Sequence, residues 1–291
     1  MISENEILKS LPALLSANSR IAVPPGDDCA VIDMNSSMQL LAAADQLIEN
    51  IHFLPETPPE AAGAKLMKRN LSDIAAMGGT PLAALCCIAV NGKDNEYVKA
   101  FLAGAAKEGE KYNVSVCGGD TASSTAPGVA ASLTILGEVP AGKAVLRSGA
   151  KPGERLYVTG KIGNSFYSEH HLTFTPRLAE GVFLRDKVSA MMDISDGLLM
   201  DLERMAEASQ VSFALDIPSI PLRPGAELPQ ALSDGEDYEL LFTSSLPEDQ
   251  LRRSDLAPIT CIGRVLPESE HPVVDSNKQI IVTEKKGYEH Q

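Results

Sequence analysis

Aspartates, most of them beside glycines, recur along this chain of 291 residues. Glycine lets the backbone approach a ligand closely, and carboxylate oxygens are the ligands that Mg²⁺ prefers. Several such segments in one chain predict a site that holds several Mg²⁺ ions and a polyphosphate, assembled from distant parts of the sequence. They are Gly26-Asp27-Asp28, Asp45, Asp73, Gly118-Gly119-Asp120-Thr121, Asp193-Ile194-Ser195-Asp196-Gly197 and Asp234-Gly235-Glu236-Asp237.

Each of these segments also has an ordinary structural explanation. The acidic pair at 27–28 follows two prolines and fits a surface turn. The segment 193–197 fits a helix N-cap, because Ser and Asp accept hydrogen bonds from free helix N–H groups. The segment 234–237 fits a tight turn. Their joint occurrence in one chain is what favours the metal site.

Other catalytic patterns are weak or missing. Residues 137–144 match the GxxxxGK core of a P-loop, but Ala144 stands where a Ser or Thr hydroxyl would meet Mg²⁺, and no helix follows. We interpret this segment as a turn that leaves a strand. His52 lies among apolar residues and by itself is typical of a packed histidine, while His170 and His171 are expected to face solvent. No hydrolase motif is present.

The composition restricts the partners. The net charge is −14, aromatic residues make up 4% of the chain and Trp is absent, which argues against nucleic-acid binding. An acidic protein can still bind a nucleotide through bridging metal ions.

The start of the chain lacks the basic residues of a signal peptide, and no apolar run is long enough to span a bilayer. The sequence therefore predicts a cytoplasmic protein without membrane contact. The five cysteines show no metal-ligand spacing and are expected as reduced core residues.

Helical and strand patterns alternate, which indicates α/β layers. Asp45, Asp120 and Asp193 are expected near strand ends, and Asp73 inside a helix. The helices are expected at 3–17, 58–77, 95–112 and 198–208. The strands are expected at 29–34, 38–44, 81–90, 114–117, 130–139, 156–159, 213–217, 238–243, 259–265 and 280–283. A basic, small-residue segment at 147–153 predicts a boundary between domains at 1–148 and 149–291.

Eight blocks carry a resemblance to a known family. The chain resembles the thiamine-monophosphate kinases, which belong to the superfamily of aminoimidazole ribonucleotide synthetase. The blocks run in the family's order from residue 24 to residue 290 and so cover nearly the whole chain. They are PPGDDCAVI, ADQLIENIHF, NLSDIAAMGGTP, CGGDT, LRSGAKPGERLYVTG, MDISDGLLMDL, DGEDYELLF and KGYEH.

The resemblance implies a two-domain synthetase-like fold, with an N-terminal α/β domain that forms a barrel across a homodimer and a C-terminal α+β domain. It implies ATP-dependent phosphorylation of thiamine monophosphate with several Mg²⁺ ions. Because the acceptor is an ionised phosphate oxygen, no general base is expected. By position, the implied metal ligands are Asp28, Asp45, Asp73, Asp120, Asp193 and Asp196. The implied ATP-site residues are Gly119, Asp120, Arg147 and Ser195, and the implied contacts to thiamine phosphate are His52, Glu236 and Tyr288.

The chain departs from the family's pattern in three places, which concern metal count and rate more than fold. Ala43 and Ala44 replace the usual hydroxyl residues, Asp234 replaces a glycine, and the segment 163–176 is short, as if a helix were missing. A hydrogenase-maturation dehydratase would need a reactive C-terminal cysteine, but this sequence ends Tyr288-Glu289-His290-Gln291. A selenophosphate synthetase would need a reactive cysteine or selenocysteine near the start, and the first cysteine, Cys29, is expected inside an apolar strand. A nucleotide-binding homologue without turnover is the remaining alternative.

Overall fold

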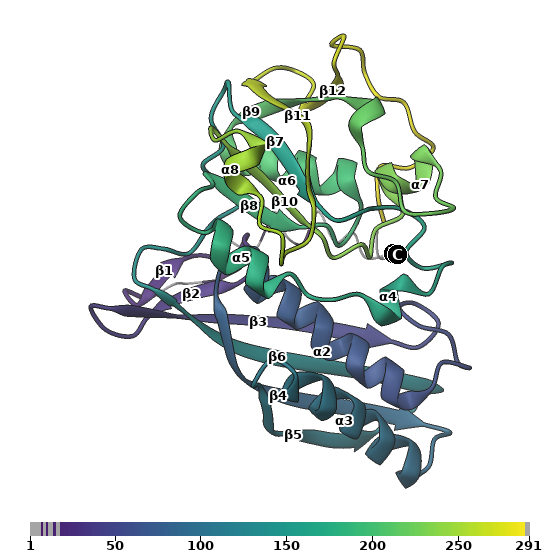
Figure 1. Cartoon of the computed structure of the whole chain (residues 1–291). Helices are drawn as coiled ribbons and strands as arrows, with labels where there is room; N and C mark the ends of the chain where they lie inside the picture. The colour runs from purple at the N-terminus through teal and green to yellow at the C-terminus, as the bar shows by residue number, and fades with distance from the viewer. Residues whose placement is uncertain (1–6, 8–9, 11–13, 16–17, 289–291) are drawn as a thin grey trace.

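A computed structural model describes residues 7, 10, 14–15 and 18–288 of the chain. Within them the chain forms two six-stranded sheets, one after the other in sequence, with helices on and between them (Figure 1). The predicted mixed α and β architecture is confirmed. Most strand pairs are antiparallel, although the alternation of helices and strands is more typical of parallel pairing.

The first sheet has the strand order β1-β2-β3-β6-β4-β5. Its central strands β3, β6 and β4 pair over 11 or more residues, and β5 adds to β4 in parallel. The strands are β1 (Ile21–Val23), β2 (Ala30–Asp33), β3 (Met38–Ile48), β4 (Thr80–Asn91), β5 (Ser115–Ser123) and β6 (Gly128–Pro140).

Two helices, α2 (Pro59–Ala76) and α3 (Asn95–Glu110), lie across one face of this sheet (Figure 1). The first turn of α2 contains proline, whose fixed φ suits a helix start, and the helix ends before Gly78 at φ +65°. The side chain of Asp94 caps α3 by accepting a hydrogen bond from the backbone N–H of Tyr97 at 2.9 Å.

The second sheet has the strand order β12-β9-β11-β7-β10-β8. Its apolar side chains form a second core with the helix α6 (Leu198–Ser209). The strands are β7 (Arg155–Thr159), β8 (Ala190–Asp193), β9 (Val211–Leu215), β10 (Leu240–Ser244), β11 (Ile259–Pro267) and β12 (Val273–Asp275). The helices are α4 (His170–Thr173), α5 (Leu178–Leu184), α6 (Leu198–Ser209), α7 (Leu228–Ser233) and α8 (Glu248–Leu251), with a 3₁₀ turn at Ile217–Ser219.

Helix α2 is the element that the two halves share. It packs on β3 and β6 of the first sheet and also contacts α4, α5 and β8 of the second half (Figure 1). Most of its residues are buried, including the charged side chains Lys65 and Lys68. None of the helices in the described part of the chain is long and apolar enough to cross a membrane.

The face of the first sheet opposite α2 and α3 stays exposed. Leu82 and Leu85 on β4 are 42% and 41% exposed, and Cys87 and Cys117 are exposed as well. The expectation that the cysteines are core residues is therefore wrong for these two. They lie on strands whose side chains alternate between a covered and an uncovered face. Strand β5, at the sheet's edge, is exposed along almost its whole length.

Several predicted element boundaries are wrong. Strand β3 continues past Asp45 to Ile48, and β5 includes Asp120 instead of ending before it. The two glycines before Asp120 suggested a break, but a Cβ at Gly119 would lie 1.7 Å from the carbonyl oxygen of Cys86, so glycine is what allows β5 to pair there. The predicted strand at 280–283 is a single bridge. The predicted helix at 3–17 lies mostly outside the described residues, and the predicted domain boundary after residue 148 stays a prediction.

The contact between α2 and α3 depends on two glycines. A Cβ at Gly63 would lie 1.9 Å from the carbonyl oxygen of Phe101, and a Cβ at Gly104 would lie 2.1 Å from that of Glu60. Alanine normally stabilises a helix relative to glycine. Here we predict that Gly104→Ala lowers the free energy of unfolding by about 1–3 kcal/mol, because the helices must separate. Urea unfolding measures this change.

The control is Ala103→Gly at the neighbouring exposed position, which should cost only about 1 kcal/mol through helix propensity. A Gly104→Ala protein that is more stable than the parent would show that the helices are not in close contact.

Candidate active site

Three carboxylates from distant parts of the chain meet where the two halves join. One carboxylate oxygen from each of Asp28, Asp73 and Asp193 lies within 4.8 Å of the others. Asp28 precedes β2, Asp73 lies in α2, and Asp193 ends β8. Helix α2, which carries Asp73, contacts β8 directly and packs on β3, the strand that pairs with β2.

The cluster is held by direct polar contacts. Arg147 donates from Nη2 to Asp28 Oδ1 at 2.6 Å, and its backbone N–H donates to Asp27. The Ser72 hydroxyl donates to Asp193 in a short hydrogen bond. Burial, followed by the charges of neighbouring carboxylates, raises the pKa values of Asp73 and Asp193 well above their usual range.

The residues of this cluster fit a divalent cation. All three offer oxygen atoms, as Mg²⁺ requires, and Asp28 Oδ2 is buried without a hydrogen-bond partner among the described residues. Close carboxylates in a buried site repel one another, and a bound cation removes that repulsion. The arrangement therefore suits a metal that is shared among the three side chains.

The loop between β8 and α6 is organised by a carboxylate that sequence reasoning missed. Asp201 is fully buried, and its Oδ2 accepts hydrogen bonds from the backbone N–H groups of Ser195, Asp196 and Gly197, each at 3.1 Å. Arg204 donates to Asp201 at 2.9 Å and to Asp196 at 2.5 Å. The backbone at 195–197 and the side chain of Asp196 are thereby fixed at the edge of the site.

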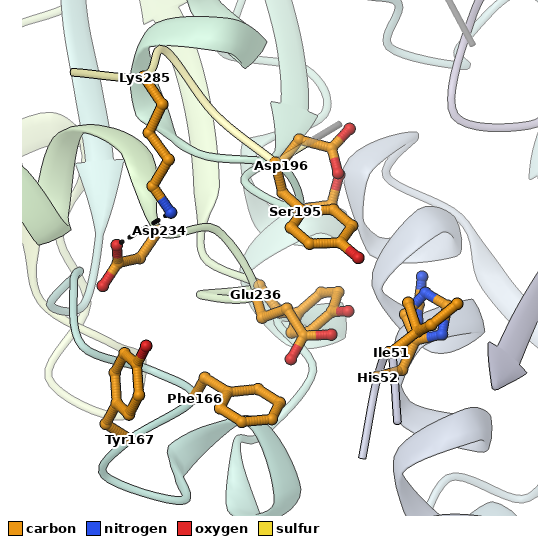
Figure 2. A pocket seen from close by; sticks show the side chains of 12 residues that line it. Ile51, His52, Phe166, Tyr167, Ser195, Asp196, Asp234, Glu236 and Lys285 are labelled. Atoms are coloured by element: carbon orange, nitrogen blue, oxygen red, sulfur yellow. Dashed lines mark ion pairs between the residues drawn. The ribbon is translucent and has the colours of Figure 1, made fainter. Parts of the chain in front are cut away.

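A pocket of about 240 Å³ is lined in part by Ser195 and Asp196, which follow Asp193 of the carboxylate cluster in the chain. Figure 2 shows Glu236 near its middle, with Ile51 and His52 on one side and the pair Asp234 and Lys285 on another. Aromatic side chains and several ionisable groups surround it. The lining residues are Ile51, His52, Arg69, Phe166, Tyr167, Ser195, Asp196, Asp234, Glu236, Tyr238, Lys285 and Tyr288.

A buried ion pair fixes Glu236 in this pocket. Lys65 is fully buried and donates from Nζ to Glu236 Oε2 at 2.7 Å and to the His52 carbonyl at 2.5 Å. The same Nζ lies 2.6 Å from His171 Nδ1. Burial opposes ionisation of Glu236, but Lys65, His171 and Arg69 outweigh it and lower its pKa to about 2. Burial lowers the pKa of Lys65 to about 8.

The backbone that presents Glu236 is strained. Glu236 and Tyr238 have φ values of +57° and +51°, and Gly235 has +76°. Non-glycine residues in this region cost of order 1–3 kcal/mol each and persist only where the surroundings hold them. Here Glu236 N–H donates to the Ser195 carbonyl at 2.7 Å and Tyr238 N–H to the Ile194 carbonyl at 2.8 Å.

The pocket opens into a wider cleft of about 1140 Å³ beside β3. Both cavities are lined by Ile51, His52, Arg69, Lys285 and Tyr288. The cleft adds Ala44, Asp45 and Gln46 of β3 to this set. It is large enough for a nucleotide beside a smaller ligand in the pocket.

Most of the site residues expected from the sequence lie around these two cavities. His52, Ser195, Asp196, Glu236 and Tyr288 line the pocket, and Asp28, Asp73 and Asp193 form the cluster with Arg147 beside it. Asp45 faces the cleft and accepts a hydrogen bond from Arg69 Nε at 3.2 Å, so it lies beside the cluster and not within it.

Gly119 and Asp120 are not brought to the site within one chain. The strand register runs from Asp120 to Cys87 on β4, to Ser132 on β6 and to Gln46 on β3. Three strand spacings separate Asp120 from β3, roughly 14 Å. Cys87 is exposed on the uncovered face of the sheet, and its register partner Asp120 lies on that face too, away from α2.

The prediction that His171 faces solvent is wrong. It is 4% exposed, because the short segment 163–176 folds over α2 and stacks Phe166 on its ring at 4.5 Å between centroids. That segment carries α4 and lines the pocket with Phe166 and Tyr167. Sequence reasoning also missed Lys65 and Arg69, although Lys65, Arg69 and Asp73 follow one another at intervals of four residues, which places all three on one helix face.

The whole chain matches known proteins. Residues 26–139 match the family model of the AIR synthase related protein N-terminal domain, and residues 141–271 match that of the C-terminal domain. Thiamine-monophosphate kinase of Salmonella typhimurium is 34% identical over 91% of this chain and 90% of its own length. The Bacillus subtilis protein is 33% identical over 99% of both. A solved structure described as AaThiL complexed with AMPPCP and TMP is 30% identical, covers 99% of this chain and 97% of its own, and has a TM-score of 0.85.

Asp201 gives a test of how the loop at 193–197 is held. We predict that Asp201→Ala lowers the free energy of unfolding by about 3 kcal/mol, because three backbone N–H groups lose their acceptor and Arg204 loses a buried partner. Denaturant unfolding measures the change. Asp216→Ala, at an exposed carboxylate that accepts a hydrogen bond from the nearby Ser219 hydroxyl, is the control and should change stability by less than about 0.5 kcal/mol. Equal effects of the two substitutions would contradict the role of Asp201.

Proposed function

The chain belongs to the thiamine-monophosphate kinases of the AIR synthase related family, and we propose that it transfers the γ-phosphoryl group of ATP to thiamine monophosphate. The products are ADP and thiamine diphosphate. One observation carries this proposal: a largely buried cluster of three carboxylates lies next to the loop that lines a pocket with His52, Glu236 and Tyr288. A metal-bound donor and a small acceptor can therefore sit next to each other.

The site residues divide into three groups in this proposal. Asp28, Asp73 and Asp193 hold Mg²⁺, with Asp45, Asp120 and Asp196 around them. Gly119, Asp120, Arg147 and Ser195 contact ATP. His52, Glu236 and Tyr288 contact thiamine monophosphate. Bound Mg²⁺ neutralises charge on the phosphate oxygens and orients them for transfer.

The chain's own residues supply position and fixed charge. The reacting oxygen of thiamine monophosphate is already ionised at neutral pH, so no side chain has to remove a proton from it. That oxygen forms a bond to the γ-phosphorus while the bond from this phosphorus to the β–γ bridging oxygen breaks, and ADP leaves. Arg147, held by Asp27 and Asp28, adds positive charge beside the cluster. The ionised Glu236 and the aromatic side chains suit the cationic thiazolium ring.

We propose that the active form is a homodimer. The uncovered face of the first sheet exposes Leu82 and Leu85, and β5 is an exposed edge strand with free backbone groups. Such edges and apolar faces are usually covered in native proteins. A second copy placed against this face would form the barrel that the family resemblance implies. It would also carry Gly119 and Asp120 toward the site of its neighbour.

The activity is tested directly with purified protein, ATP, Mg²⁺ and thiamine monophosphate. We predict that thiamine diphosphate forms, and that Asp120→Ala abolishes turnover while the fold, measured by circular dichroism and thermal unfolding, stays intact. ATP binding without product would favour the homologue that lacks turnover. Full activity of Asp120→Ala would remove Asp120 from the site.

Mixing two inactive variants tests whether the site is shared between subunits. Asp120→Ala and Asp193→Asn are each expected to be inactive alone. If Asp120 acts on the neighbouring subunit's site, a mixed dimer contains one site with both residues intact. After unfolding and refolding an equal mixture, we predict recovery of about a quarter of the parent activity, since half of the dimers are mixed and one site in each works. No recovery would place Asp120 and Asp193 in the same chain's site, or outside the site altogether.

A further inference from the structure

One face of α2 carries charged side chains at successive helical turns. Lys65, Arg69 and Asp73 are each four residues apart, so they follow one another along the helix at intervals of roughly 6 Å. Lys65 binds Glu236 in the pocket, and Asp73 belongs to the carboxylate cluster. Arg69 lies between the two, at the point where an acceptor in the pocket would meet a phosphoryl donor at the cluster.

Asp45 holds the Arg69 side chain in place through one nitrogen, but another guanidinium nitrogen has no acceptor among the described residues. The Arg69 side chain is 11% exposed, and Nε donates to Asp45 Oδ2 at 3.2 Å. Its Nη1 is buried and has no hydrogen-bond partner among the described residues. A guanidinium has five N–H donors, and a buried charged donor without a partner is costly. The pairing with Asp45 through Nε alone leaves the terminal nitrogens available to a second anion.

The other charged groups of the pocket already have partners. Among the described residues, Glu236 pairs with Lys65 at 2.7 Å, Asp196 with Arg204 at 2.5 Å, and Asp234 with Lys285 at 3.7 Å. Lys285 is also 57% exposed, so water screens its charge. Arg69 is therefore the lining cation that combines burial, a fixed position and uncommitted donors.

We propose that Arg69 binds the phosphate group of the acceptor and gives the site its preference for thiamine monophosphate over unphosphorylated thiamine. The inference rests on the proposed function and adds a residue that determines acceptor specificity. A guanidinium binds phosphate through two parallel N–H···O bonds. Two oxygens held in this way leave the third free to attack the γ-phosphorus. Without the guanidinium, the phosphate would enter a pocket lined by three carboxylates.

The test is the ratio of the dissociation constants for thiamine and thiamine monophosphate, measured by calorimetry with Mg²⁺ and without nucleotide. The full-length protein should bind thiamine monophosphate more tightly. In Arg69→Gln this ratio should fall roughly 10- to 100-fold, through loss of affinity for thiamine monophosphate alone. Arg69→Lys keeps the charge but not the paired donors, and should lie between the parent and Arg69→Gln. In turnover, KM for thiamine monophosphate should rise.

Arg185→Gln is the matched control. Arg185 is also partly buried, has an Nε without a partner among the described residues and donates to the Gly78 carbonyl at 2.8 Å, but it does not line the pocket. Arg185→Gln should leave the ratio of the two dissociation constants unchanged.

An unchanged ratio in Arg69→Gln, or a parallel loss of affinity for both ligands, would overturn the proposal. Arg69 would then serve to hold Asp45. If Arg69→Gln does not fold, the test rests on Arg69→Lys. A ratio of dissociation constants in Arg69→Lys equal to that of the parent would reject the proposal. A parent protein that binds neither ligand and forms no thiamine diphosphate would reject the proposed function and this inference together.

Discussion

The burial of charged side chains on α2 is the constraint on which the rest of the structure depends. A charge removed from water is tolerated only when partners surround it. The helix is covered on both sides, by the first sheet and by the second half of the chain, so each half has to supply partners. Asp45 comes from the first half, Glu236 comes from the second, and Asp28 and Asp193 meet Asp73 between them. The site therefore lies where the two halves of the chain meet, because helix α2 lies there.

The two ends of the helix face resolve this constraint in different ways. At Lys65 the protein provides its own counter-charge, and the pair with Glu236 forms without any ligand. At Asp73 the protein gathers like charges, and burial raises the pKa values of Asp73 and Asp193. Such a cluster is stable only with protons or with cations. One end is thus preorganised for a small ligand, whereas the other has the ligands to hold a divalent cation.

The residues outside the site serve the same geometry. Gly63 and Gly104 let α3 pack closely on α2 and so hold the helix on its sheet. Asp201 and Arg204 hold the loop that carries Ser195 and Asp196. Backbone contacts from this loop keep Glu236 in a left-handed conformation, where its cost is offset by the surrounding packing. The precision of the pocket depends on these supports as much as on the residues that line it.

The sequence by itself determined the family, the mixed α and β architecture and most of the residues around the cavities, because glycine-flanked aspartates are visible as local patterns and the eight motif blocks point to the family's site positions, among them His52, Glu236 and Tyr288. It did not reveal Lys65, Arg69 or His171, because lysine, arginine and histidine side chains are ordinarily expected to face solvent. Only the tertiary structure decided that these three are buried at one pocket, and that Asp120 lies on the opposite face of the sheet. The physical reason is that burial and strand register arise from contacts between segments far apart in the chain, and no local pattern encodes which segments will meet.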